Sequence, residues 1–223
     1  MRRLLAAAAA AALIVGLAAC TSDPLASQYR EGDNKGFIAG DFRVDEIPAD
    51  ERGEPVDFAG TTEHGDEVTS ADYVGDVLVV NFWYAACGPC IVEAPRLEAA
   101  YTSFEGQDVS FLGVNTYDQA ETAASFARDN NVSYPSVIDV NSGSVKLAFA
   151  DKTPINATPT TLVIDKQGRV AARISGRIAA SSILESMIQK VLDEGGPDAG
   201  SDGADGDSTA GDSAAGGSTG AGS

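Results

Sequence analysis

Two cysteines, separated by two residues, lie where a predicted buried strand meets a predicted helix. Asp76 to Tyr84 (DVLVVNFWY) is a continuous apolar run rich in Val and aromatic residues, which is typical of a central strand. From Gly88 onward, apolar residues recur at helical spacing, at Ile91, Ala94, Leu97, Tyr101 and Phe104. Cys87 and Cys90 therefore flank the start of a helix. Their spacing alone allows a redox couple, half of a zinc site or a small structural bridge.

Strands and helices alternate through the next hundred residues, which predicts an α/β domain. Further strands are expected at 108–115 and 134–139, helices at 118–131, 143–150 and 180–192, and a hairpin at 161–174 whose turn contains Gly168. We expect a mixed central sheet with helices on both faces, preceded by an N-terminal hairpin within 53–73.

The first residues have the pattern of an export signal. A basic start (MRR) precedes an apolar run from Leu4 to Leu17, which is too short to cross a bilayer comfortably. The run ends in Leu-Ala-Ala-Cys, which resembles the bacterial lipobox, whose cysteine is lipidated and becomes the new N-terminus. We therefore predict a signal peptide at 1–19 and lipidation of Cys20. A plain signal peptide with an incidental cysteine and an uncleaved anchor are the alternatives.

Composition divides the rest of the chain. Residues 20–44 are polar and are expected to form a flexible tether from the lipid to a domain at 45–193, and the Gly/Ala/Ser/Asp-rich residues 194–223 are expected to be a disordered tail.

The net charge is −18, and the sequence has no cluster of Lys and Arg. Such a chain repels phosphate backbones, so we expect no nucleic-acid partner.

The cysteine count limits the chemistry. If Cys20 carries a lipid, Cys87 and Cys90 remain as one pair, with no odd thiol in an oxidising compartment. A structural zinc site needs four ligands, whereas the domain offers two thiols and one histidine, His64. We therefore expect no metal, and no cofactor other than a redox-active Cys87–Cys90 disulfide.

The strand–helix junction predicts different roles for the two thiols. A helix N-terminus presents unpaired N–H groups and a partial positive charge, which stabilise a thiolate at Cys87. Cys87 is therefore the predicted attacking thiol. Cys90 lies one turn into the helix, so we expect it to be less accessible and to resolve the mixed disulfide.

The motif is similar to those of a known family. VVNFWYAACGPC resembles the active-site segment of the thioredoxin superfamily, and CGPCIVEAP resembles the C-x-x-C-x-x-E-x-P pattern of its extracytoplasmic TlpA/ResA branch. ATPTTLVIDKQGRV is similar to a later segment of that family. The resemblance spans residues 42–192. It implies a thioredoxin fold with a central strand–helix insert near 118–150, and thiol–disulfide oxidoreductase activity.

The resemblance also implies roles for residues away from the cysteines. Thr158-Pro159 matches the family's cis-proline position, where the backbone of the preceding residue pairs with an extended substrate. Glu93 matches a glutamate near the buried thiol, where desolvation should raise its pKa and let it take the proton of Cys90. The substrate site is further expected to include Gly88, Pro89, Trp83 and Tyr84.

Two positions distinguish this sequence from its relatives. Asn81 stands where cytoplasmic thioredoxins have an aspartate, which leaves Glu93 as the carboxylate candidate in this segment. Ala86 stands directly before Cys87, where the family usually has a tryptophan. The loss of that indole affects the inference about the substrate more than the inference about the chemistry.

Several functions fit this pattern. The first is a membrane-tethered, monomeric disulfide reductase on the extracytoplasmic face of the cell membrane, re-reduced by a membrane thiol–electron carrier, with apocytochrome c among its clients. The second is an oxidase that donates its disulfide to secreted proteins. A surface binding lipoprotein with a structural disulfide is the non-enzymatic alternative. A peroxidase is disfavoured, because NFWYAA before Cys87 lacks the P-x-x-x-T/S-x-x-C setting.

Overall fold

The computed structural model describes residues 38–39 and 42–194 of the 223. The predicted signal peptide, the lipidation site Cys20 and most of the predicted tether and tail lie outside the described residues. None of the helices in the described part of the chain is both long and apolar enough to cross a membrane.

A mixed sheet forms the centre of the domain, as predicted. In the described part of the chain it has seven strands, in the order β1-β2-β9-β8-β5-β6-β7. The strands are β1 (Ile38–Ala39), β2 (Phe42–Glu46), β5 (Val77–Trp83), β6 (Val109–Asn115), β7 (Ser136–Ile138), β8 (Thr160–Ile164) and β9 (Val170–Gly176). β5 pairs in parallel with β6 and antiparallel with β8, so it is hydrogen-bonded on both edges. All seven of its residues are buried, which explains its continuous apolar sequence.

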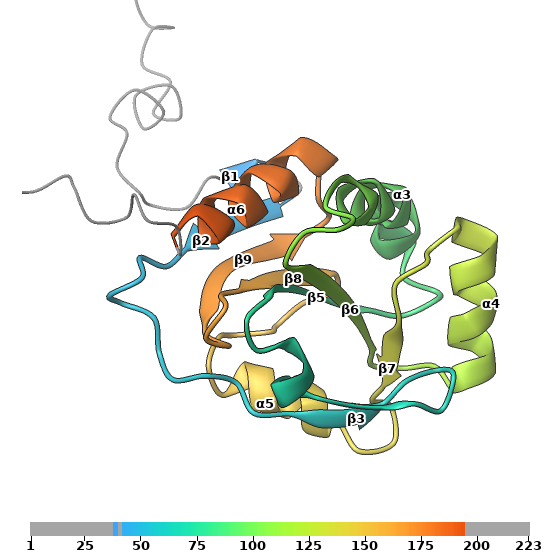
Figure 1. The fold of residues 1–223 in the computed structure, drawn as a ribbon. Coiled ribbons are helices and arrows are strands. Elements are labelled where there is room, and N and C mark those ends of the chain that lie inside the picture. Colours follow the sequence, from blue (N-terminus) through green and yellow to red (C-terminus); the bar gives the residue numbers. More distant parts are fainter. Residues whose placement is uncertain (1–37, 40–41, 195–223) are drawn as a thin grey trace, which may run out of the picture.

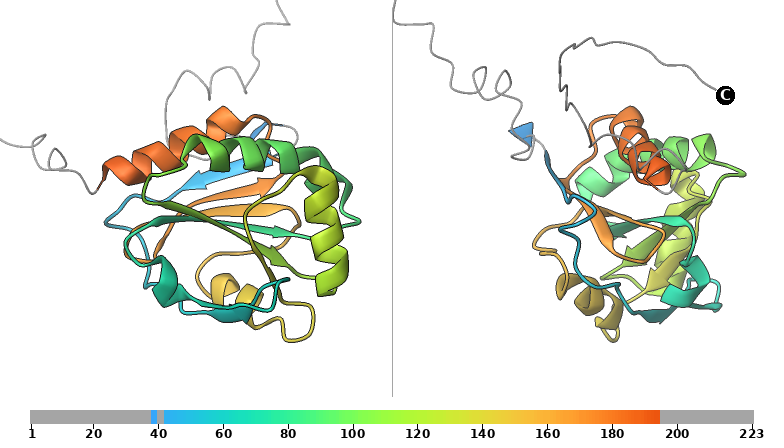
Figure 2. Two further views of the ribbon diagram at one scale, coloured as in Figure 1. Left: turned by 45° about the vertical axis from the view of Figure 1, so that its right-hand side comes forward. Right: turned by 60° about the vertical axis from the view of Figure 1, so that its left-hand side comes forward.

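Helices cover both faces of the sheet (Figures 1 and 2). α3 (Gly88–Ser103) and α6 (Ser181–Asp193) lie side by side on one face, whereas α5 (Ser144–Ala150) lies on the other. α4 (Ala120–Asn130) packs beside α3 and β7. Successive side chains of β5 point to opposite faces of the sheet. Val79 packs with α3 and α6 on one face, and Leu78 and Val80 pack with α5 on the other.

The predicted N-terminal hairpin is present as a separate two-stranded sheet. β3 (Ala59–Thr61) pairs antiparallel with β4 (Glu67–Thr69), and a short 3-10 helix, η2 (Ser70–Tyr73), follows. A single bridge between Thr62 and Val137 joins the hairpin region to β7, the edge strand of the main sheet. This part of the hairpin therefore lies against an edge that would otherwise be open to another chain.

Both predicted boundaries of the domain need correction. The tether was expected to continue to residue 44, but β2 begins at Phe42, pairs with β9 and buries Val44. A short strand that contains Arg43, Asp45 and Glu46 has a weak apolar signal, so the sequence did not reveal it. At the other end, Glu194 was assigned to the tail. Its carboxylate instead accepts two hydrogen bonds from the buried side chain of Arg52, at 2.6 and 2.8 Å. A buried guanidinium needs such acceptors.

Gly113 in β6 gives a test of the packing beneath the cysteine pair. A Cβ at this position would overlap Ser136 Oγ and lie 2.8 Å from Trp83 Nε1. We predict that Gly113→Ala lowers the free energy of unfolding by about 1–3 kcal/mol, measured by urea unfolding of the oxidised protein. Gly53→Ala is the matched control, since a Cβ there meets nothing within 4 Å. Equal stability of the two variants would contradict this packing.

Candidate active site

Cys87 and Cys90 form a disulfide at the N-terminus of α3. Cys87 is the N-cap residue, and its sulfur accepts a hydrogen bond from the backbone N–H of Cys90 at 3.2 Å. Pro89 occupies the first turn, where its missing N–H costs no helical hydrogen bond. Gly88 and Pro89 are both exposed. The local sequence thus places the Cys87 sulfur within the field of the helix N-terminus, as expected from the strand–helix junction.

The two cysteines are almost equally buried. Their relative exposures are 3% for Cys87 and 2% for Cys90, so the expected difference in accessibility is absent in the disulfide form. The reason is packing, because both sulfur-bearing side chains belong to one cluster with Trp83 and Ala123. What distinguishes the thiols is their surroundings. Cys87 caps the helix and faces Thr158, whereas Cys90 lines a small cavity with Asn81.

The chain segment before β8 reaches the disulfide from one side. The Thr158–Pro159 peptide bond is cis, in agreement with the family resemblance, and the carbonyl oxygen of Thr158 lies 3.9 Å from Cys87 Sγ. β8 runs antiparallel to β5, with Thr160 opposite Phe82, so the start of β8 lies beside the end of β5. This pairing brings together residues that are 71 positions apart.

Glu93 is buried on the inner side of α3, with a relative exposure of 1%. Its Oε1 accepts a hydrogen bond from Asn81 Nδ2 at 2.9 Å, and its Oε2 accepts one from the backbone N–H of Ile178 at 3.0 Å. Burial raises the pKa of Glu93 to about 7, and the two hydrogen bonds and the charges of Arg96 and Arg177 oppose part of that rise. The direction and the cause agree with the prediction.

Asn81 links Glu93 to the rest of the site. Its side-chain amide also donates to Thr161 Oγ1 at 3.0 Å, and it lines the same cavity as Cys90 and Tyr134. Burial and the charge of Glu93 raise the pKa of Tyr134 as well. The sequence singled out Asn81 but not Thr161, because a contact across 80 residues leaves no local signal.

Arg96 supports the same region from one turn further along α3. Its guanidinium donates to the carbonyl oxygen of Ile178 at 2.6 Å, while the N–H of that residue donates to Glu93. Two residues of one helix therefore hold the same residue of the segment between β9 and α6. Neither Arg96 nor Ile178 was identified from the sequence.

The two predicted aromatic site residues have different environments. Trp83 is buried, donates from its indole N–H to Ser136 Oγ at 3.2 Å and packs on Phe126, so it supports the cysteine cluster from inside the domain. Tyr84 is half-buried, and its ring centroid lies 5.7 Å from that of Tyr117. Contact of either residue with a substrate stays a prediction.

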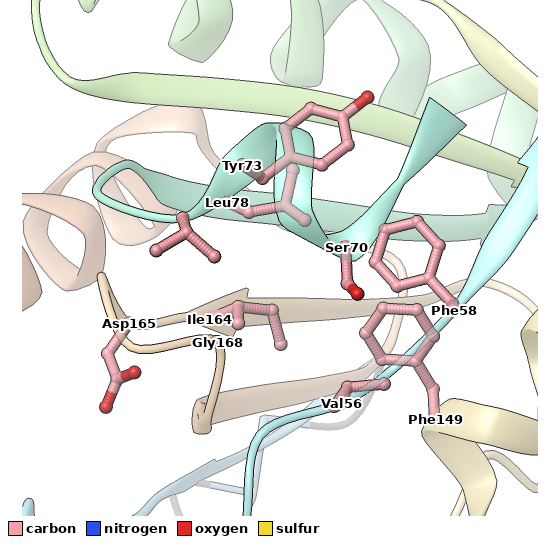
Figure 3. A pocket seen from close by; sticks show the side chains of 10 residues that line it. Val56, Phe58, Ser70, Tyr73, Leu78, Phe149, Ile164, Asp165 and Gly168 are labelled. Carbon is pink, nitrogen blue, oxygen red and sulfur yellow. The ribbon is translucent and has the colours of Figure 1, made fainter. Parts of the chain in front are cut away.

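A second hollow lies on the α5 side of the sheet, away from the cysteines (Figure 3). Mainly apolar side chains line it, among them Val56, Phe58, Leu78 and Phe149. It contains none of the predicted site residues.

Comparison with known proteins agrees with the geometry. Residues 53–173 match the AhpC/TSA family. The thiol-disulfide oxidoreductase ResA of Geobacillus kaustophilus is 32% identical over 127 residues, which cover 57% of this chain and 70% of the relative. The chain belongs to the AhpC/TSA family, in its ResA-type branch. ResA-type proteins are thiol–disulfide oxidoreductases, and so is this protein.

Solved structures show the same fold. A DsbF homologue from Corynebacterium diphtheriae superposes with a TM-score of 0.58 at 26% identity, covering 66% of this chain and 92% of the other. A secreted thiol-disulfide isomerase from Corynebacterium glutamicum gives a TM-score of 0.60 at 25% identity, covering 71% and 99%. The thioredoxin fold predicted for this ResA-type oxidoreductase is therefore confirmed, and its relatives include secreted proteins.

The loop between β6 and α4 is a part of this ResA-type site that the sequence did not reveal. Asp118 Oδ2 accepts a hydrogen bond from the backbone N–H of Ala85 at 2.6 Å, two residues before Cys87. Asn115 Nδ2 donates to the same oxygen at 3.0 Å, and Asn115 Oδ1 accepts the N–H groups of Tyr117 and Asp118. This loop therefore fastens the segment that carries Cys87. An Asn followed three residues later by Asp was the available signal.

Glu93 predicts a pH dependence of stability. The carboxyl group holds its proton more tightly in the folded chain, with a pKa of about 7 against an ordinary 4.5, so the protonated form favours folding. As pH rises from about 4.5 to about 7, the free energy of unfolding should fall, relative to Glu93→Gln, by on the order of 3 kcal/mol.

Urea unfolding of the oxidised wild type and of Glu93→Gln across this pH range measures the effect. The exposed Glu105 supplies the control, because Glu105→Gln should keep the pH dependence of the wild type. Parallel pH profiles for wild type and Glu93→Gln would show that Glu93 titrates normally.

Proposed function

We propose that this chain is a membrane-tethered reductase of disulfide bonds in extracytoplasmic proteins. The Cys87 thiolate attacks a client disulfide, forms a mixed disulfide and releases one client thiolate. The Cys90 thiolate then attacks the Cys87 sulfur, closes the Cys87–Cys90 bond and releases the second client thiolate. Two electrons pass to the client, and the domain is left oxidised.

Client binding in this proposal uses the backbone next to the cis-proline. An extended client segment would pair with Thr158 as an added strand, with its disulfide beside Cys87. The 3.9 Å separation between the Thr158 carbonyl oxygen and Cys87 Sγ supports this arrangement, because a strand bound to that backbone lies within reach of the sulfur.

Resolution requires Cys90 to lose its proton, and Glu93 is the proposed acceptor. A general base works best when its pKa is near the working pH, and burial raises the pKa of Glu93 to about 7. Glu93 lies three residues after Cys90, on the same side of α3. Asn81 donates a hydrogen bond to Glu93 and lines the same cavity as Cys90.

The burial of Glu93 is the observation that carries the direction of electron flow. A carboxylate near the pair disfavours thiolates, which stabilises the disulfide over the dithiol and lowers the reduction potential. The helix N-terminus stabilises the Cys87 thiolate and so raises the reduction potential, but this stabilisation is at most about 2 kcal/mol. The span between thioredoxin and DsbA, about 150 mV, corresponds to about 7 kcal/mol. The helix alone therefore does not make this protein an oxidant.

The oxidised domain needs a source of electrons, which we propose is a membrane thiol–electron carrier. The Leu-Ala-Ala-Cys motif supports a lipid anchor at Cys20, which would hold the domain near such a carrier on the extracytoplasmic face. Apocytochrome c, whose haem-site cysteines must be reduced before haem attachment, is a proposed client.

The opposite direction is the second candidate function. Similarity to the secreted thiol-disulfide isomerase of Corynebacterium glutamicum favours a protein that forms or rearranges disulfides in secreted clients. The same two cysteines would then donate their disulfide.

The reduction potential separates these two functions. Equilibration with graded thiol/disulfide buffers should give about −250 mV or lower, close to the value of about −270 mV for thioredoxin. Glu93→Gln should raise the potential by about 30 mV or more, because it removes the carboxylate, whereas the exposed Glu105→Gln should leave it unchanged. A wild-type potential near −120 mV would overturn the reductase and support the oxidase.

The lipid anchor is tested by Cys20→Ser. We expect the wild type to incorporate a labelled fatty acid in a bacterial host and to sediment with membranes, because the acyl chains bury in the bilayer. Cys20→Ser should lose the label, while Cys87→Ser should keep it. Label retained in Cys20→Ser, or absent from the wild type, would refute the anchor.

A further inference from the structure

The order of the strands places two chain segments on either side of Cys87. β5 lies between β8 and β6 in the sheet. β8 is antiparallel to β5, whereas β6 is parallel to it. The start of β8 and the end of β6 therefore both lie beside the C-terminal end of β5. Thr158 and Pro159 precede β8 on one side. Tyr117 follows β6 on the other side, in ring contact with Tyr84.

Tyr117 combines a fixed backbone with an exposed ring. Its N–H donates to Asn115 Oδ1 at 3.0 Å, and the neighbouring Asp118 holds the N–H of Ala85 at 2.6 Å. The side chain is nevertheless 74% exposed. An aromatic ring on an anchored backbone loses little conformational entropy when it binds a partner.

The chain segment that carries the disulfide is uncharged. No residue from Val77 to Val92 carries a charge, although 22% of the whole chain is charged. Five large apolar side chains are exposed in the described part of the chain, and Ile91, Val92 and Tyr117 are three of them. Ile91 and Val92 directly follow Cys90. The exposed apolar residues of this segment favour contact with an apolar part of a partner.

The geometry points to an aromatic subsite, formed by Tyr117 and Tyr84, that binds an apolar side chain next to the reactive cysteine of a client. The client backbone lies along Thr158 on one side of Cys87. The apolar side chain of the client contacts the rings of Tyr117 and Tyr84 on the other side. This inference rests on the proposed attack of Cys87 on a client disulfide. It assigns Tyr117 a role in choosing clients and leaves the thiol chemistry to the cysteines.

Two peptides test the subsite. Both contain the same internal disulfide, and the residue after each cysteine is Leu in one and Ser in the other. The full chain is reduced beforehand, and the rate at which each peptide disulfide is reduced is measured by chromatography. The Leu peptide should react faster in the wild type, and Tyr117→Ala should lower the Leu-to-Ser ratio of the second-order rate constants about five- to tenfold. Tyr117→Phe should keep the ratio, because it keeps the ring.

Leu147 supplies the matched control. It is 62% exposed on α5, on the other face of the sheet, so Leu147→Ala should leave both rates unchanged. An equal ratio in wild type and Tyr117→Ala, or a ratio lost in Tyr117→Phe, overturns the subsite. If the reduced wild type reacts neither with the peptides nor with a small disulfide, the proposed reductase fails instead.

Discussion

The site depends on the hydrogen bonding of β5 along both of its edges. Because β8 is the antiparallel neighbour and β6 the parallel one, three chain segments meet where β5 ends. One segment contains Thr158 and Pro159, the second contains Cys87, and the third contains Tyr117. The backbone hydrogen bonds of a buried strand are costly to leave unpaired, so this strand order brings the three segments together, and the hydrogen bond from Ala85 N–H to Asp118 adds a direct link between two of them.

A second constraint is the carboxyl group inside the helical layer. Burying Glu93 costs free energy unless neighbouring groups donate hydrogen bonds to it. Asn81 and the N–H of Ile178 do so, but the pKa remains raised, which shows that they offset only part of the cost. The same burial provides a group that exchanges a proton near neutral pH. If Glu93 takes the proton of Cys90, as proposed, stability and reactivity are coupled at one residue.

Sequence reasoning succeeded where the signal was local and failed where it was not. The seven apolar residues of β5 and the helical spacing after Gly88 identified the strand and α3. β2 escaped notice because it is short and three of its five residues are charged. The accessibility of Cys87 was predicted from its place in the helix, but neighbours such as Trp83 and Ala123, which pack around it, decide its burial.

The sequence by itself predicted the family and the cysteine pair at a helix N-terminus, and the resemblance to that family predicted the raised pKa of Glu93. Each of these follows from residues within a few turns of one another or from a motif. Only the tertiary structure decided that Thr161 and Ile178 stabilise the buried Asn81–Glu93 pair and that Tyr117 lies beside Tyr84. The physical reason is that local preferences act over one or two turns, whereas these contacts arise from the order in which distant strands pair.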